Sequence, residues 1–102
     1  MVKAIRFHQT GGPEVLRLQD VEVGDPGPGQ ARVRHTYVAV NFIDIYFRTG
    51  VYPLPLPEGT GSGLGSDAVG VVEAVGPGVT DIRVGDRVGY LIGPQGAYSQ
   101  VR

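Results

Sequence analysis

The sequence predicts a mainly β domain, and three observations support this fold class. Blocks rich in Val, Ile, Leu and Tyr recur along the whole chain of 102 residues, as in a protein of many short strands. The 17 glycines and 8 prolines fall between these blocks, so they indicate tight turns rather than disorder. Hydrophobic residues make up 41% of the chain, which is enough for one modest core and one domain.

The N-terminal region predicts two strands. Residues 2–7 (VKAIRF) alternate apolar with polar or small side chains, as a half-buried strand does. The break at residues 11–13 (GGP) turns the chain, and residues 15–23 (VLRLQDVEV) alternate again. The alternation slips at Gln19 and Asp20, which predicts a bulge or a bend there.

A third strand follows a loop. Residues 24–30 (GDPGPGQ) predict the loop, and residues 31–40 (ARVRHTYVAV) predict the strand. The last residues of this strand are continuously apolar, which is typical of a strand buried on both sides. The alternation places four residues on one face: Val33, His35, Tyr37 and Ala39.

Residues 41–49 (NFIDIYFRT) have helical rather than strand spacing. Asn41 is a good N-cap residue, and Asp44 in the first turn favours the positive end of the helix dipole. Gly50 fits the C-terminal stop, and Pro53 prevents continuation of the helix. The sequence therefore predicts one short helix directly after a buried strand.

The second half of the chain predicts further strands after a long irregular loop at residues 52–63. Residues 67–75 (DAVGVVEAV) predict a strand in which Gly70 allows close backbone approach. Residues 76–78 (GPG) predict a turn with positive φ at the second glycine. Residues 82–91 predict a strand after Gly-Asp, and GAYSQV begins another. Together these elements predict a strongly bent sheet or open barrel with one helix.

Composition excludes several function classes. Nine Lys and Arg against ten Asp and Glu give a net charge of −1 without a basic block, so no nucleic-acid partner is expected. Cysteine is absent, which excludes disulfides and thiolate ligands. No signal peptide and no apolar run near the roughly 20 residues of a membrane helix appears, so we expect a cytoplasmic protein without a membrane partner. His8 and His35 lie far apart in sequence, and surface or strand-packing roles are expected for both.

Four motifs occur in a specific order: NFIDIYFRTGVYP, GLGSDAVGVVEAVGPGV, VGDRVGY and GAYSQV. In this order and spacing the chain resembles the quinone oxidoreductases of the medium-chain dehydrogenase/reductase superfamily. The resemblance covers nearly the whole chain. It implies that residues 1–102 are the N-terminal portion of a GroES-like catalytic domain, an open and strongly bent β-barrel with one short helix and no Rossmann domain.

The resemblance also bears on zinc. In the zinc alcohol dehydrogenases of this superfamily a catalytic cysteine stands at the position of Asn41, and a GHE motif stands at Gly65, Ser66 and Asp67. An amide and a hydroxyl are poor zinc ligands, since zinc prefers thiolate and imidazole. The resemblance therefore implies an enzyme that works without zinc.

Members of the family pass hydride from NADPH to a quinone, and the resemblance implies candidate site residues. Asn41 would lie near the nicotinamide and ribose, and Tyr46 would touch cofactor and quinone. Tyr52 would border the quinone pocket, and Ser66 would face the nicotinamide. Structural roles remain as alternatives: a helix cap, a core tyrosine, a loop tyrosine and a turn serine. For Asp44 and Arg48, four residues apart on the helix, a structural ion pair is expected.

Two functions from different classes remain open. The first is the catalytic-domain part of an NADPH-dependent quinone oxidoreductase, with a Rossmann domain as partner and homo-oligomer formation undecided. The second is an isolated or engineered, non-catalytic GroES-like β-module. The glycine-rich GTGSGLG (residues 59–65) lacks the βαβ context of a dinucleotide fingerprint. We therefore expect the chain alone to bind NADPH weakly or not at all.

Overall fold

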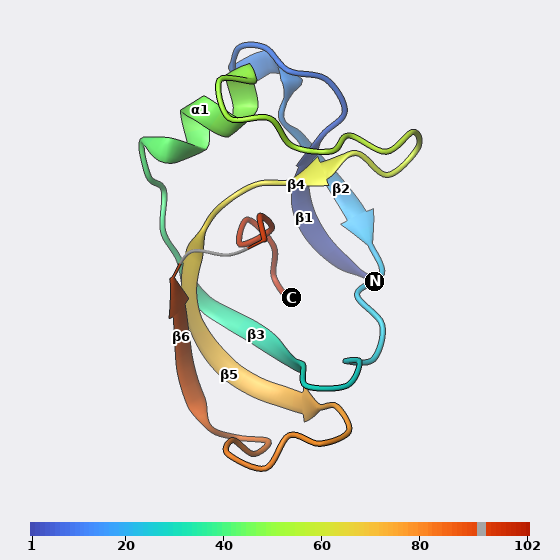
Figure 1. Cartoon of the computed structure of the whole chain (residues 1–102), viewed down its shortest axis with the longest axis vertical. Helices are drawn as coiled ribbons and strands as arrows, with labels where there is room; N and C mark the ends of the chain where they lie inside the picture. The colour runs from blue at the N-terminus through green and yellow to red at the C-terminus, as the bar shows by residue number, and fades with distance from the viewer. Residues whose placement is uncertain (92–93) are drawn as a thin grey trace.

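The computed structural model describes residues 1–91 and 94–102 and contains two three-stranded antiparallel sheets and one α-helix (Figure 1). The first sheet has the strand order β2-β1-β4, and the second has the order β3-β5-β6. The two sheets do not close on each other, so the prediction of a mainly β, open and strongly bent barrel is confirmed. The elements are β1 (Val2–Phe7), the 3₁₀ helix η1 (Pro13–Val15), β2 (Arg17–Val21), β3 (Ala31–Val38), α1 (Ile43–Thr49), β4 (Ser62–Gly63), β5 (Asp67–Val75) and β6 (Arg87–Leu91).

The first sheet corrects the prediction of a bulge at Gln19 and Asp20. These residues pair with Ala4 and Lys3 in an unbroken register. β2 is an edge strand, and its Leu18 is 66% exposed. An apolar residue on the solvent side disturbs the alternation without disturbing the backbone, because edge strands need not bury every apolar side chain.

The long irregular loop is shorter than predicted. Ser62 and Gly63 form β4 and pair with Phe7 and Arg6 of β1. Every strand pair among the described residues is antiparallel. The described part of the chain therefore contains no parallel βαβ unit of the dinucleotide-binding type.

The second sheet contains the irregularities that the sequence did not reveal. The pairing of β3 with β5 shifts between Arg32 and Val33 and again between His35 and Tyr37. Because of the second shift, Tyr37 does not continue the face of Val33 and His35, and its side chain is 77% exposed. The prediction of a strand end buried on both sides is also wrong, since Val40 is 82% exposed.

Two glycine predictions in this sheet are confirmed. A Cβ on Gly70 would lie 2.2 Å from the carbonyl oxygen of Arg34, so the backbones approach as closely as predicted. After β5, Gly78 has a φ of 82°, and the amide of Val79 donates to the carbonyl of Gly76 at 3.4 Å. This is the predicted turn with its glycine at positive φ.

The C-terminal segment forms isolated bridges where the sequence predicted a regular strand. Ser99 pairs with Ala4 of the first sheet, and Val101 pairs with Arg34 of the second sheet. The segment therefore changes partners within two residues, and it runs between the two sheets in Figure 1. The segment hydrogen-bonds to both sheets in turn, since the Gln100 amide donates to the Lys3 carbonyl and the Arg102 amide donates to the Val33 carbonyl, each at 2.9 Å.

A hydrophobic cluster lies at the end of the molecule that carries α1. Phe7, Val15 and Leu64 are its buried centre, at 0%, 6% and 1% exposure, and Phe47 of α1 packs against them. The helix ends at Gly50, whose φ of 90° and amide bond to the Phe47 carbonyl confirm the predicted stop. No helix among the described residues is long and apolar enough to cross a membrane.

Candidate functional site

Asn41 precedes α1 but does not cap it, so the N-cap prediction is wrong. The N-cap position is Phe42, and no side chain caps the helix. The amide of Asn41 instead donates to a carboxylate oxygen of Asp67, the first residue of β5. Asp44 bonds to the local main chain, because its Oδ2 accepts a hydrogen bond from the main-chain N–H of Asn41 at 3.0 Å. The Asn41 side chain is thereby free to reach across to the second sheet.

Asp44 is one of two buried polar side chains among the described residues, with 3% exposure. Its Oδ2 also accepts a hydrogen bond from the Tyr98 hydroxyl of the C-terminal segment. Its Oδ1 is buried and has no hydrogen-bond partner in the part of the chain that the structure describes. Burial raises the pKa of the Tyr98 hydroxyl, and the hydrogen bond to Asp44 raises the pKa further.

The predicted ion pair between Asp44 and Arg48 does not form. Asp44 points toward Tyr98, whereas the Nε of Arg48 donates to the carbonyl of Gly11 at 3.1 Å. The spacing of four residues allows contact on a helix, but each side chain finds a stronger partner outside the helix. Both residues therefore fasten α1 to the barrel.

Asn41 and Asp44 line a pocket of about 420 Å³ beside α1. Its walls are largely apolar, with Tyr98 and Arg48 as further polar contributors. A volume of this size suits a small aromatic ligand, since ligand pockets commonly fall between roughly 300 and 1,000 Å³. The residues that line it are Leu16, Val40, Asn41, Phe42, Asp44, Ile45, Arg48, Leu64 and Tyr98.

Tyr46 and Tyr52 lie side by side. Their ring centroids are 5.3 Å apart with an edge-to-face angle of 65°, and the amide of Tyr52 donates to the carbonyl of Tyr46 at 3.1 Å. The left-handed turn at Gly50 folds the chain back and brings the second ring to the first. The rings are 37% and 45% exposed, so solvent reaches both. Within the described residues neither hydroxyl has a hydrogen-bond partner.

Phe42 connects this aromatic pair to Asn41. Its ring centroid lies 5.6 Å from that of Tyr46, and its side chain is 70% exposed. Asn41 is its neighbour in the chain and contacts Asp67. Phe42 also lines the pocket that Asn41 lines, whereas Tyr46 and Tyr52 do not line it, and no direct contact joins Asn41 to Tyr46.

Ser66 is buried beside Asp67, with 6% exposure. Its Oγ accepts a hydrogen bond from the Gln95 amide at 3.0 Å, and the Gln95 oxygen accepts the Gly65 amide proton at 3.1 Å. Gln95 thus covers the Ser66 hydroxyl. Of the four candidate residues, Tyr46 and Tyr52 contact each other. Asn41 binds the side chain of Asp67, and Ser66 is the chain neighbour of Asp67.

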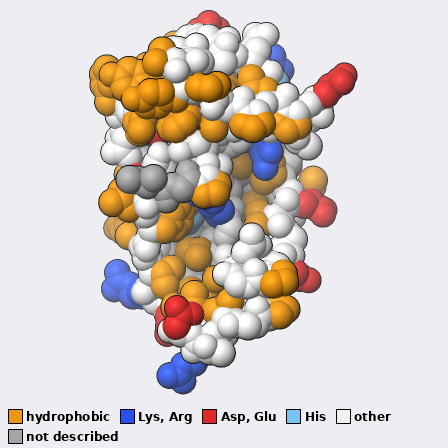
Figure 2. Space-filling model, viewed as in Figure 1, with side chains coloured by type: hydrophobic (Ala, Val, Ile, Leu, Met, Phe, Trp, Pro, Cys, Tyr) orange, Lys and Arg blue, Asp and Glu red, His pale blue; other side chains and the backbone are white. Residues whose placement is uncertain are grey.

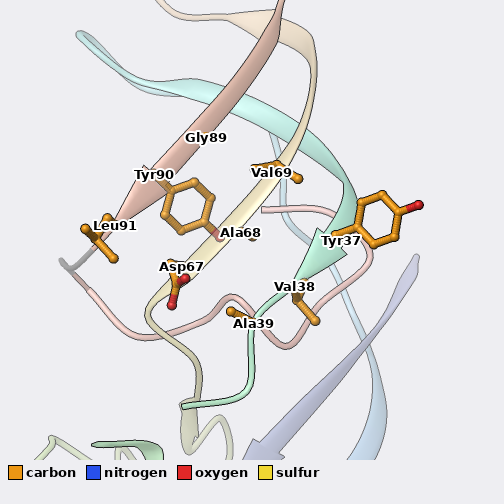
Figure 3. Close-up of a pocket in the computed structure, with 9 residues that line it drawn as sticks. All are labelled: Tyr37, Val38, Ala39, Asp67, Ala68, Val69, Gly89, Tyr90 and Leu91. Atoms are coloured by element: carbon orange, nitrogen blue, oxygen red, sulfur yellow. The ribbon is translucent and has the colours of Figure 1, made fainter.

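A second, open pocket of about 390 Å³ lies on the other side of Asp67, between the ends of β3, β5 and β6. Figure 3 shows the Tyr90 ring between the strands and the Asp67 carboxylate below it. The Tyr37 ring points away from the other labelled side chains. Asp67 therefore separates this pocket from the Asn41 side chain that it binds.

Both histidines have structural roles, as the sequence predicted. The Nδ1 of His35 lies 2.7 Å from the carbonyl of Ser99, and its Nε2 lies 2.8 Å from the Tyr90 hydroxyl. His8 is exposed and contacts Gln19. Within residues 1–91 and 94–102 no three His, Asp or Glu side chains come together in a grouping that could hold a metal.

Sequence reasoning missed the contributions of Asp67, Gln95 and Tyr98. Asp67 follows directly on Ser66, so its position in the GSD segment was a usable signal. Gln95 and Tyr98 gave no signal, because they reach the site only when the C-terminal segment folds between the sheets. Local spacing cannot report contacts across 29 and 54 residues.

Comparison with known proteins identifies relatives of the whole chain. Residues 27–101 match the family described as the alcohol dehydrogenase GroES-like domain. The chain is 52% identical over 101 residues to a quinone oxidoreductase of Pseudomonas aeruginosa, and 50% identical over 103 residues to a 2-haloacrylate reductase of Burkholderia. These matches cover 99% and 100% of this chain but 30% and 31% of the relatives.

Solved structures agree with these matches. A quinone oxidoreductase of Pseudomonas syringae superposes with a TM-score of 0.94 at 52% identity over 100% of this chain. The Escherichia coli quinone oxidoreductase complexed with NADPH superposes with a TM-score of 0.89 at 44% identity over 98% of this chain. In each case the chain spans 30% of the solved relative.

Proposed function

Because the chain belongs to the alcohol dehydrogenase GroES-like domain family and resembles quinone oxidoreductases over nearly all its length, we propose that it is the catalytic-domain part of an NADPH-dependent quinone oxidoreductase. Residues 1–102 would form the N-terminal portion of that domain. A Rossmann domain, a quinone and NADPH are the partners that this proposal requires. The reaction would transfer hydride from the nicotinamide to the quinone.

One observation carries the proposal: the half-exposed Tyr46 and Tyr52 rings form an edge-to-face pair beside α1. Aromatic rings with exposed faces and edges suit a flat ligand such as a quinone or a nicotinamide. Both hydroxyls are without partners among the described residues, so each can donate to a carbonyl oxygen. Tyr46 and Tyr52 would orient the quinone, and neither has to transfer a proton for hydride transfer to proceed.

We propose that the nicotinamide end of NADPH binds beside the start of α1. Asn41 and Tyr46 would hold it, with Ser66 beside them once Gln95 releases the Ser66 hydroxyl. When bound, NADPH supplies the hydride, and the protein holds the donor and the acceptor in position. Asp67 would fix the Asn41 amide through its hydrogen bond, so that the amide presents a constant direction to the ligand. The NADPH complex of the Escherichia coli relative supports this part of the proposal.

The donor chemistry does not fit a catalytic zinc ion. Asn41 turns its N–H toward Asp67, and an N–H group donates rather than coordinates. Ser66 offers a hydroxyl already engaged by Gln95, and zinc prefers thiolate and imidazole ligands. Hydride transfer to a quinone does not require a Lewis acid, because the reduced product is a stabilised aromatic phenolate. We therefore propose a reaction without zinc.

A domain graft tests the proposal. The chain would replace the matching segment of the Pseudomonas aeruginosa quinone oxidoreductase, and NADPH oxidation would be measured with 1,4-benzoquinone, with and without a chelator. We expect chelator-resistant turnover that falls at least about tenfold in Tyr46→Ala and in Asn41→Ala, since misplacing the reactants costs on this order. Tyr37→Ala is the matched control, because Tyr37 is 77% exposed and does not line the pocket beside α1.

A folded graft that binds NADPH but reduces no quinone would contradict the proposed reaction and favour a non-catalytic module. The 50% identity to a 2-haloacrylate reductase gives a second candidate acceptor, an alkene conjugated to a carboxylate. The same graft would therefore be assayed with 2-chloroacrylate. Turnover with the acrylate alone would keep hydride transfer and replace the quinone as substrate.

A further inference from the structure

A pocket of about 230 Å³ lies between the first sheet and the C-terminal segment, away from the aromatic pair. Two arginines line it, Arg6 from β1 and Arg102 from the C-terminal segment. Figure 2 shows Lys or Arg side chains in the recessed middle of this face, between the two halves of the molecule. The lining of the pocket thus includes two cationic residues from opposite ends of the chain.

Arg6 is partly buried and only partly satisfied. Its Nη1 donates to the carbonyl of Thr60 at 3.1 Å. Its Nε is buried and has no hydrogen-bond partner among the described residues. A guanidinium N–H that is shielded from water and has no acceptor is costly, so this position favours an acceptor.

Arg102 has the same incomplete pattern. Its Nη2 donates to the carbonyl of Pro94, while its Nη1 is buried without a partner in the described chain. The guanidinium carbon lies 5.0 Å from the centroid of the Tyr90 ring. A Cβ on Gly96 would lie 3.6 Å from its Nε, so the group also packs over the Gly96 backbone. The ring, the carbonyl and the backbone hold the guanidinium in place.

The other polar groups of the pocket do not supply the missing acceptor. Glu22 is the one acidic residue among the described lining residues, and it forms no ion pair with Arg6 or Arg102. The Gln95 amide is used by Ser66 and Gly65, and the Ser99 hydroxyl donates to the Val101 carbonyl at 2.6 Å. Glu22 is therefore the one acidic side chain among the described lining residues, and the Arg6 Nε and the Arg102 Nη1 are buried without partners in the described chain.

We propose that this pocket binds a small oxyanion, a phosphate or a carboxylate, between Arg6 and Arg102. Guanidinium groups pair preferentially with such anions, because two oxygens can accept parallel N–H bonds. A volume of about 230 Å³ is below the usual range of roughly 300–1,000 Å³ for drug-sized ligands. The pocket thus suits a compact anion and is too small for a dinucleotide. The inference is independent of the proposed hydride transfer.

The Nε–H resonances of the arginines report binding directly. The chain would be titrated by NMR with sodium phosphate and, separately, with sodium acetate at pH 7, each against sodium chloride at equal ionic strength. We expect saturable shifts at Arg6 and Arg102 and at the backbone amides of Gly63 and Gly96. The anion whose titration saturates at the lower concentration, phosphate or acetate, identifies the class of anion that the pocket binds. Shifts that never saturate, or that chloride reproduces, overturn the proposal.

Variants that remove the same charge distinguish a specific anion site from non-specific electrostatic attraction. Arg6→Gln and Arg102→Gln should each weaken binding at least about tenfold, because each removes a charge-assisted hydrogen bond. Arg17→Gln is the control: it removes the same charge from an exposed position directly opposite Arg6 in the β1–β2 register. Equal weakening in all three variants would overturn the proposal. If either site variant unfolds, Arg6→Lys or Arg102→Lys keeps the charge and should still weaken binding.

Discussion

The Tyr98 hydroxyl donates a hydrogen bond to the buried carboxylate of Asp44 and so fastens the C-terminal segment to the helix. The carbonyl of the same tyrosine accepts the Ile5 amide proton of β1 at 2.8 Å. Asp44 also accepts a hydrogen bond from the main-chain N–H of Asn41. These three hydrogen bonds therefore connect β1, the C-terminal segment and the residue that we place nearest the nicotinamide.

The stability of the fold should depend on pH in the alkaline range through Tyr98. Burial, followed by the Asp44 hydrogen bond, raises the pKa of Tyr98 above the ordinary value of about 10. The stabilisation is complete below pH 10, where both states keep the proton. Above pH 10 the unfolded chain loses its proton first, so the free energy of unfolding falls as the pH rises toward the folded-state pKa.

Tyr98→Phe should remove this part of the slope. The slope is at most about 1.4 kcal/mol per pH unit, and partial exposure of the ring makes it smaller. Urea unfolding between pH 8 and 11 measures it, with Tyr37→Phe as an exposed control that keeps the wild-type slope. A Tyr98→Phe variant with an unchanged alkaline slope would show that Tyr98 is not the group responsible.

Asp44→Ala should destabilise the fold by at least about 2 kcal/mol, because it leaves the Tyr98 hydroxyl and the Asn41 amide without their acceptor. Chemical denaturation at pH 7 measures the loss. Asp81→Ala removes the same charge from an exposed residue and should stay within about 0.5 kcal/mol of the wild type. Similar losses in both variants would mean that net charge, and not the buried contact, sets the stability.

Asn41→Asp should be destabilising at neutral pH, because it places a second carboxylate against Asp67. We expect a loss of about 1–3 kcal/mol at pH 7 that shrinks as the pH falls and one carboxylate of the pair takes up a proton. Urea unfolding at pH 7 and pH 4 gives the comparison. Asn41→Ala, which loses the hydrogen bond without adding charge, should show a deficit that does not shrink in this way.

Gly70→Ala should be among the most harmful single changes in the second sheet. The added Cβ would lie 2.2 Å from the Arg34 carbonyl oxygen, a backbone atom that cannot move without separating β3 from β5. We expect a loss of at least about 2 kcal/mol in thermal or urea unfolding. Gly89→Ala on β6 is the control, since its Cβ would meet the Val69 side chain at 3.2 Å and that side chain can adjust. Equal losses would show that the close backbone approach is not decisive.

Several local features followed from the sequence because their causes are local. The alternation of residues 2–7 gave β1 with its observed bounds, and that of residues 67–75 gave β5. Gly50 and Gly78 adopt the positive φ that their contexts required. Each of these features depends on neighbouring side chains or on the conformational freedom of one glycine.

The errors arose where a distant group competed with a local preference. Asn41 had the residue type of an N-cap, but its side-chain amide donates a hydrogen bond to Asp67, 26 residues away in the chain. Asp44 and Arg48 had the spacing of an ion pair, but Tyr98 and Gly11 offered other partners. The slip in β2 looked like a bulge only because its edge position was unknown.

The sequence alone was sufficient to predict the fold class, the end of the helix and the family. Four features became visible only in the folded chain: the direction of the Asn41 side-chain amide, the contact of Tyr46 with Tyr52, the cover that Gln95 places over Ser66 and the presence of Arg6 and Arg102 in one pocket lining. The predictable features are local, because periodicity and turn chemistry act between neighbours along the chain. Hydrogen bonds between buried polar groups form with whichever partners the packing of the two sheets brings within reach.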